Sequence, residues 1–161
     1  MLSKEHPHAR DYARSHPALT DAETGLANRL HFELVYNYLF EAGSRGMPFT
    51  VMLVSIPVDD ATAAHDLRTL GQKIQETTRD SDLVSHVGSG RYGVLLLGTN
   101  LQGGRIAADR IEMALDGIVP GDLCFGLVPY SAATADSQEL LEAADRALLT
   151  AEAAGGGLEF G

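Results

Sequence analysis

The chain of 161 residues has no tryptophan, a single cysteine and no long apolar run. Its longest apolar stretches, such as 51–56 and 94–97, have the length of a strand and are too short to cross a bilayer. A single cysteine, Cys124, excludes an internal disulfide, and its place in a predicted strand favours a buried, unreactive thiol. Residues 1–17 are polar and lack the apolar segment of a secretory signal. We therefore expect a cytoplasmic protein that does not enter a membrane.

The sequence also contains no cluster of basic residues. Lys and Arg number 12 against 22 Asp and Glu, which gives a net charge of −10. A chain with this charge repels a nucleic acid polymer unless a local basic patch intervenes. Aromatic residues make up only 6% of the chain, so it offers few platforms on which single-stranded bases could stack. We therefore expect no binding of nucleic acid polymers.

Length and composition indicate one globular domain preceded by a short arm. Hydrophobic residues make up 45% of the chain, which is enough to bury a substantial core. Residues 1–19 are polar and predict a flexible N-terminal arm, and residues 20–161 are predicted to form the domain. His6 and His8 in the arm lack a nearby third metal ligand, which favours a solvated tail.

Helical and strand patterns alternate along the domain. The first helix is predicted to begin near residue 26 and to end at the glycines at 43 and 46. Its buried stripe is predicted to comprise Leu30, Leu34, Val35, Tyr38 and Leu39. The other predicted elements are strands at 49–56, 82–87, 92–97 and 123–128, helices at 64–78, 106–115 and 140–151, and a short edge strand at 158–160.

Between the first and last helices the order is strand, helix, strand, strand, helix, strand. This is the split βαβ plan. We therefore predict an α+β sandwich of two or three layers, with a ferredoxin-like βαββαβ core and a central, mostly antiparallel sheet. The segment Gly88-Ser89-Gly90 joins the two adjacent strands and predicts a hairpin turn.

Four sequence blocks resemble the GGDEF family, whose members make cyclic di-GMP from two GTP molecules. The blocks are D-A-E-T-G-L-A-N-R-L-H-F (21–32), R-D-S-D-L (79–83), D-R-I (109–111) and A-D-R-A-L (144–148). The first is similar to the family's D-x-L-T-G-L-x-N-R-x-x-F, with Glu23 in place of the usual Leu and a tight turn expected at Gly25. The blocks occur in the family's order and cover roughly residues 21–158, so the resemblance implies a GGDEF-like fold.

The resemblance also implies that the family's catalytic site has been lost. Its reaction uses two Mg²⁺ ions held by carboxylates. Two of the family's acidic positions at the end of the first strand match Ser55 and Pro57, and two in the GGDEF turn match Gly90 and Arg91. An arginine in place of a carboxylate repels a divalent cation. The implied degenerate site, without metal or cofactor, comprises Ser55, Pro57, Gly88, Ser89, Gly90, Arg91 and Tyr92.

Two further departures lie beside this site. Glu152 stands where the family has a lysine that contacts phosphates, and the short, alanine-rich segment 58–66 replaces the segment that reads guanine. Asp59 and Asp60 could supply carboxylates only after a register shift past Pro57, which would not repair the GGDEF turn. The chain is therefore predicted to be an inactive diguanylate cyclase homologue, not an enzyme.

A second family site is retained. It is an R-x-x-D motif that binds cyclic di-GMP as an inhibitor, and Arg79 and Asp82 match it, while Arg110 matches an arginine that often completes it. A guanidinium can bind a phosphate or the guanine O6/N7 edge, and a carboxylate can accept from guanine N1–H and N2–H₂. The alternative interpretation is a surface ion pair between Arg79 and Asp82 that binds no ligand.

We therefore predict a cyclic di-GMP receptor that passes its signal to a protein partner. The resemblance further implies that the ligand can bridge two copies into a homodimer. The alternative hypothesis is a ligand-independent interaction scaffold that docks a partner through the altered face around Arg91 and Tyr92.

The other polar residues of interest are predicted to be structural. His86 is expected to be partly buried or at the surface, and His31 and His65 are expected to face solvent. Asn28 and Arg29 are expected to cap and pair around the turn that precedes the first helix.

Overall fold

The computed structural model describes residues 16–57, 64–119, 121–134 and 136–161. The elements are η1 (Pro17–Leu19), α2 (Arg29–Gly43), β1 (Phe49–Ser55), α3 (Ala64–Thr77), β2 (Leu83–Gly88), β3 (Arg91–Leu97), α4 (Leu101–Leu115), β4 (Cys124–Pro129), α5 (Ser137–Ala153) and β5 (Gly157–Phe160). Each predicted helix and strand is present, with ends shifted by a few residues. Within the described ranges, no helix combines the length and apolar character needed to cross a membrane.

The five strands form one sheet in the order β2-β3-β1-β4-β5. Neighbouring strands are antiparallel except β4 and β5, which are parallel. In the central strand, Val51 lies opposite Leu95 on one side and Val128 on the other. This arrangement confirms the predicted ferredoxin-like βαββαβ core with a mostly antiparallel sheet.

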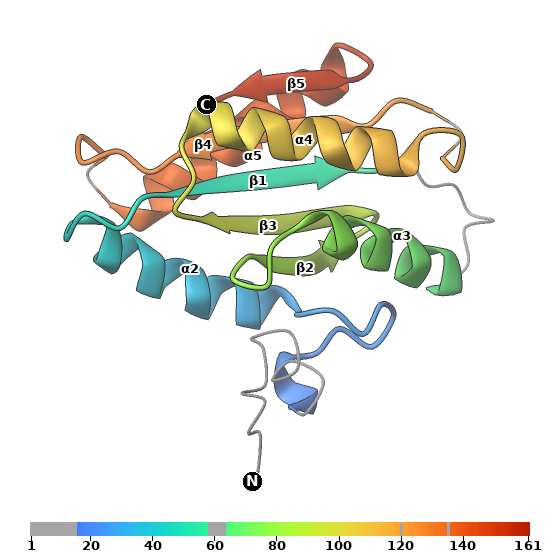
Figure 1. The fold of residues 1–161 in the computed structure, drawn as a ribbon, viewed down its shortest axis with the longest axis horizontal. Coiled ribbons are helices and arrows are strands. Elements are labelled where there is room, and N and C mark those ends of the chain that lie inside the picture. The colour runs from blue at the N-terminus through green and yellow to red at the C-terminus, as the bar shows by residue number, and fades with distance from the viewer. Residues whose placement is uncertain (1–15, 58–63, 120, 135) are drawn as a thin grey trace, which may run out of the picture.

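Helices cover both faces of the sheet and give the molecule three layers (Figure 1). Side chains of β1 alternate between the two faces. Val51 and Leu53 pack in the core cluster shared with α2 and α5, while Met52 and Val54 pack in the cluster shared with α3 and α4. A strand that is buried on both faces requires apolar residues at nearly every position, which explains the nearly continuous apolar run of β1.

The buried face of α2 differs from the predicted stripe. The large apolar side chains buried there are Phe32, Tyr36 and Leu39, and the predicted Val35 is partly buried against the core. Leu39 was predicted correctly, but Leu30, Leu34 and Tyr38 are exposed. Both sets have helical spacing, so periodicity alone could not choose between them. The aromatic rings determine which face of α2 is buried, because those of Phe32 and Tyr36 stack with their centroids 6.2 Å apart and fill the layer between α2 and the sheet.

The segment before α2 is fastened to that helix. Asn28 is the N-cap, as predicted: its side chain accepts from the His31 backbone N–H at 3.0 Å and donates to the Ala18 carbonyl at 2.9 Å. The predicted turn is also present, since Gly25 has φ +74°, a conformation that favours glycine. Residues 16–19, which were expected to belong to the flexible arm, are therefore tied to α2, whereas residues 1–15 lie outside the described residues.

Two histidines are buried in this region. His31 is buried instead of facing solvent as predicted, and its burial lowers its pKa, although a hydrogen bond with the Leu19 backbone opposes that effect. His86 is also buried, with Nδ1 3.0 Å from a carboxylate oxygen of Asp21. The side chain of His65 lies outside the described part of the structure.

Candidate functional site

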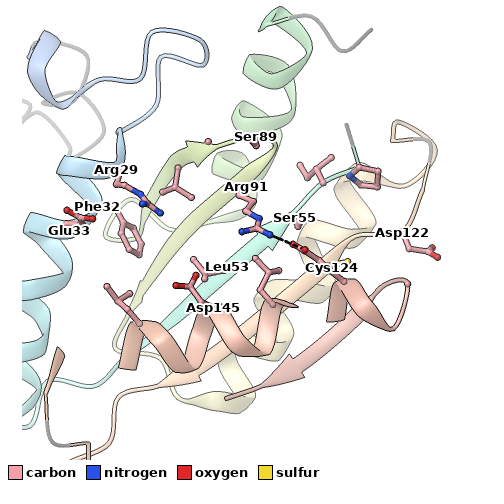
Figure 2. A pocket seen from close by; sticks show the side chains of 18 residues that line it. Arg29, Phe32, Glu33, Leu53, Ser55, Ser89, Arg91, Asp122, Cys124 and Asp145 are labelled. Atoms are coloured by element: carbon pink, nitrogen blue, oxygen red, sulfur yellow. Dashed lines mark hydrogen bonds and ion pairs between the residues drawn. The ribbon is translucent and has the colours of Figure 1, made fainter. Parts of the chain in front are cut away.

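A groove of about 970 Å³ lies beside the hairpin that joins β2 and β3, on the face of the sheet covered by α2 and α5 (Figure 2). We call it the hairpin groove. Leu53, Phe32 and Leu148 contribute apolar surface to it. One helical turn beyond Phe32, the Tyr36 hydroxyl donates to the Ser137 carbonyl and holds α2 and α5 together. The groove is lined by the first two turns of α2 and by residues 141–152 of α5.

The hairpin groove contains five of the seven residues predicted for the degenerate site. These are Ser55, Pro57, Gly88, Ser89 and Arg91. The other two do not line it. The Gly90 carbonyl accepts from the Ile56 N–H at 2.9 Å. Tyr92 is fully buried on the opposite face, where its hydroxyl donates to the Leu67 carbonyl at 2.7 Å. The expectation that Tyr92 belongs to a docking face is therefore wrong, because consecutive strand residues point to opposite faces.

The predicted hairpin turn is present, and it consists of the two residues between Gly88 and Arg91. Ser89 and Gly90 both have positive φ, at 47° and 72°, which matches the twist of the flanking strands. Ser89 is the one non-glycine residue with positive φ in the described part of the chain, a conformation that costs roughly 1 kcal/mol. The tight turn places Arg91 at the start of β3, where its side chain enters the groove.

Arg91 forms an ion pair with Glu152 of α5. Its Nη2 lies 2.9 Å and 3.0 Å from the two carboxylate oxygens (Figure 2). In the GGDEF pattern that the sequence resembles, the first of these positions is acidic and the second is a lysine, so the resemblance implies an exchange of charge between them.

Four further charged residues line the hairpin groove. Arg29 and Glu33 come from α2, Asp145 comes from α5, and Asp122 precedes β4. Figure 2 shows Arg29 extending from α2 toward the hairpin. Arg29 was predicted to be structural. The sequence signal for its place in the hairpin groove is the N-R pair of the first block that resembles the GGDEF family.

The residues present do not fit the two Mg²⁺ ions of the family's reaction. Mg²⁺ prefers carboxylate oxygens, whereas Ser55 and Arg91 provide a hydroxyl and a guanidinium. In the described ranges, no three His, Cys, Asp or Glu side chains are grouped so that they could hold a metal ion. Cys124, also in the groove, is buried as predicted, and its burial, with a smaller effect of nearby Glu152 and Asp122, raises its pKa and keeps the thiol protonated.

A second groove, of about 460 Å³, lies where the end of α3, the end of β3 and the start of α4 meet. We call it the RxxD groove. Arg79, Asp82 and Arg110 all line it. The structure therefore brings together the three residues that the sequence singled out, although Arg110 follows Asp82 by 28 residues.

Asp82 is almost fully buried at the base of this groove. One of its carboxylate oxygens accepts from the Arg79 backbone N–H at 3.0 Å and from Arg79 Nε at 3.4 Å. The other accepts from the Leu97 N–H at 3.1 Å and from Arg79 Nη2 at 3.3 Å. The carboxylate therefore orients the Arg79 side chain and ties the end of α3 to β3.

The two arginines of the RxxD groove differ in their surroundings. The Arg79 side chain is 58% exposed, and its Nη2 also donates to Thr99 Oγ1 at 2.8 Å. Arg110 is exposed on α4 and forms no ion pair with the described residues. The neighbouring Arg105 is also exposed but does not line the groove.

Neither a family sequence model nor a curated protein matches the chain. Several solved structures match the chain. The coiled coil and GGDEF domain of DgcB from Caulobacter crescentus, in complex with c-di-GMP, matches with a TM-score of 0.80 and 16% identity over 94% of this chain and 88% of that chain. The diguanylate cyclase SiaD from Pseudomonas aeruginosa, in complex with its activator SiaC, matches with a TM-score of 0.79 and 17% identity over 94% and 65%.

The GGDEF domain of FimX from Pseudomonas aeruginosa matches with a TM-score of 0.75 and 18% identity, over 88% of this chain and 97% of that chain. The chain therefore has the GGDEF-domain fold, which confirms the predicted fold.

Proposed function

We propose that this chain is a receptor for cyclic di-GMP that binds the dinucleotide in the RxxD groove. The observation that supports this function best is the meeting of Arg79, Asp82 and Arg110 at one groove. The ligand class is supported by the complex of the DgcB GGDEF domain, which has the same fold, with c-di-GMP.

Each side chain has a role in this proposal. Arg110 and Arg79 present two guanidinium groups to a ligand that has two phosphates and two guanine O6/N7 edges. Asp82 holds Arg79 in place. Among the hydrogen bonds that the Asp82 carboxylate accepts, those from Arg79 Nε and Nη2 are the longest, at 3.4 Å and 3.3 Å. Those two contacts are the ones that guanine N1–H and N2–H₂ would replace on binding.

We further propose that the chain does not synthesise cyclic di-GMP. Ser55 and Arg91 offer no carboxylate at the hairpin groove, and the Arg91 guanidinium is paired with Glu152. A cation held there raises the electrostatic cost of placing a divalent metal beside it. The remaining function is binding, and the signal would pass to a protein partner. The complex of SiaD with its activator SiaC supports the idea that proteins with such a domain bind partners.

A second candidate function is an interaction scaffold that needs no ligand. The observation that favours it is the set of internal hydrogen bonds of Asp82, which already occupy both carboxylate oxygens. In that case Arg79 and Asp82 serve to close the junction of α3 with β3, and the groove has no occupant.

Calorimetric titration with cyclic di-GMP tests the receptor. We expect micromolar or tighter binding to the parent chain and a loss of about tenfold or more in affinity for Arg79→Ala and for Arg110→Ala, since each removes charge-assisted hydrogen bonds. Arg105→Ala is the matched control, because it removes an exposed arginine from the same helix outside the groove. The control should bind like the parent.

Two outcomes would contradict these proposals separately. No heat at about 1 mM ligand would exclude the receptor and favour the scaffold. The chain can also be incubated with GTP and Mg²⁺ or Mn²⁺, with the products separated by chromatography. Formation of cyclic di-GMP would show that the chain is an enzyme despite its altered hairpin groove.

A further inference from the structure

The Arg79 guanidinium has a second anchor besides Asp82. Its Nη2 donates to the Thr99 hydroxyl oxygen at 2.8 Å and to the Leu97 carbonyl, whereas its distance to the Asp82 carboxylate oxygen is 3.3 Å. Thr99 lies between β3 and α4 and follows Asp82 by 17 residues. Because Nη2 carries only two hydrogens, the neutral Thr99 hydroxyl competes with the carboxylate and is the closer of the two side-chain acceptors.

Thr99 is itself fixed by the elements around it. Its hydroxyl donates to the Leu97 carbonyl of β3 at 3.2 Å, and its own carbonyl accepts from the Thr50 hydroxyl of β1 at 2.7 Å. Thr50 is fully buried in the sheet, and Asn100, the next residue after Thr99, is the N-cap of α4. The Thr99 hydroxyl therefore meets Arg79 from a junction that β1, β3 and α4 hold in place.

We propose that Thr99 is a positioning residue of the RxxD groove, which keeps the Arg79 guanidinium oriented while cyclic di-GMP is bound. This inference rests on the proposed function, in which guanine N1–H and N2–H₂ replace the contacts of Asp82 with Arg79 Nε and Nη2. Once those contacts are given up, the Thr99 hydroxyl and the Leu97 carbonyl still hold Nη2. The Arg79 side chain is 58% exposed, so without this second anchor it would gain rotamer freedom, and ordering it again would weaken binding.

The alternative role of Thr99 is purely structural, namely to close the junction of β3 with α4. A structural role predicts that removing the hydroxyl lowers the free energy of unfolding and leaves the affinity for the ligand unchanged. A positioning role predicts a loss of affinity that depends on Arg79, because Thr99 acts through that side chain. The affinity and its dependence on Arg79 therefore separate the two roles.

Calorimetric titration of the full chain with cyclic di-GMP tests the positioning role. We expect Thr99→Val, which removes the hydroxyl and keeps the side-chain volume, to bind about fivefold more weakly than the parent. Thr99→Ser keeps the hydroxyl and should bind like the parent. Thr77→Val is the matched control, because Thr77 lines the same groove but its hydroxyl donates to the Ile74 carbonyl within α3 at 2.7 Å. The control should also bind like the parent.

A double-mutant cycle shows whether Thr99 acts through Arg79. Arg79→Ala combined with Thr99→Val should bind no more weakly than Arg79→Ala alone. A further loss in the combined variant, equal to that of Thr99→Val in the parent, would show that Thr99 contacts the ligand itself and would overturn the positioning role. Thermal melts verify that each variant folds. Thr99→Ala, which also removes the hydroxyl, replaces the valine variant if that variant is unfolded.

Two outcomes distinguish a failure of this inference from a failure of the proposed function. Binding to the parent with an unchanged affinity for Thr99→Val would overturn the role of Thr99 and leave the receptor intact. No binding to the parent at about 1 mM ligand would overturn the receptor and the role of Thr99 together.

Discussion

At the scale of single residues, the hairpin groove is distinguished by the ion pair between Arg91 and Glu152. Arg91 and Glu152 are 61 residues apart in the chain, and their side chains meet at 2.9 Å. Each substitution alone would leave a charge facing a like charge of the original pattern. Together the two side chains attract each other, which is what the resemblance to the GGDEF pattern implies for a groove whose turn carries an arginine. The pair is partly exposed, so its contribution to stability is modest.

Reversing the pair tests this interpretation. Arg91→Glu places a carboxylate against Glu152, and we expect a loss of about 1 kcal/mol in the free energy of unfolding. Arg91→Glu combined with Glu152→Lys should recover most of that loss, because the attraction returns with opposite polarity. Urea denaturation of the parent and the two variants measures the difference. Equal stabilities for the single and double variants would show that the ion pair contributes nothing.

His31 predicts a dependence of stability on pH. Its folded-state pKa lies below the ordinary value of 6.5 because the ring is buried. Below about pH 6.5 the unfolded chain therefore binds a proton that the folded chain does not, and stability falls as the pH decreases through that range. Denaturation at about pH 7.5 and pH 5 should show a smaller decrease for His31→Gln than for the parent. An identical decrease for both chains would assign the effect to other groups.

At the scale of elements, α5 packs on β4 more closely than an ordinary side chain permits. A Cβ at Gly126 would lie 2.6 Å from the Leu148 nitrogen and 2.7 Å from the Ala144 carbonyl oxygen. Both atoms belong to the helix backbone and cannot move independently of α5. The glycine therefore sets the distance between this helix and the sheet, and with it one wall of the hairpin groove.

Gly126→Ala should consequently lower the free energy of unfolding by about 3 kcal/mol, because α5 must shift to accept the methyl group. Gly103→Ala is the matched control. The atoms that its Cβ would approach belong to side chains, the Thr99 methyl group at 2.8 Å and Asn100 Oδ1 at 3.5 Å, so no helix backbone has to move. In α4 the change should be neutral or slightly stabilising. Thermal and urea denaturation measure the stability of both variants. An equally small loss of stability in both would refute the close contact between Gly126 and the α5 backbone.

At the scale of the whole molecule, the two grooves are far apart. The hairpin groove lies at the Ser55 end of β1 on the face covered by α2 and α5. The RxxD groove includes Pro48, at the other end of β1, and residues of α3 and α4 that cover the opposite face. A ligand in the RxxD groove would therefore leave the Arg91–Glu152 pair untouched.

This separation predicts a selective effect of cyclic di-GMP on thermal stability. Ligand at 100 times its dissociation constant stabilises the folded state by about 2.7 kcal/mol, which corresponds to a rise of about 5–10 °C in Tm for a domain of this size. Arg91→Ala should retain that rise, while Arg110→Ala should lose most of it. A scan of Tm against ligand concentration provides the measurement. Loss of the shift in Arg91→Ala alone would relocate the ligand to the hairpin groove.

The sequence by itself determined the order of helices and strands, the hairpin turn, the turn at Gly25 and the hydroxyl and guanidinium that Ser55 and Arg91 bring to the hairpin groove. These features are local, since they follow from apolar spacing, turn residues and the identity of single side chains. The tertiary structure decided which face of α2 is buried, that Arg91 meets Glu152, and that Asp82 is enclosed by its own chain. Those outcomes depend on contacts between residues far apart in the chain, and no local pattern specifies them.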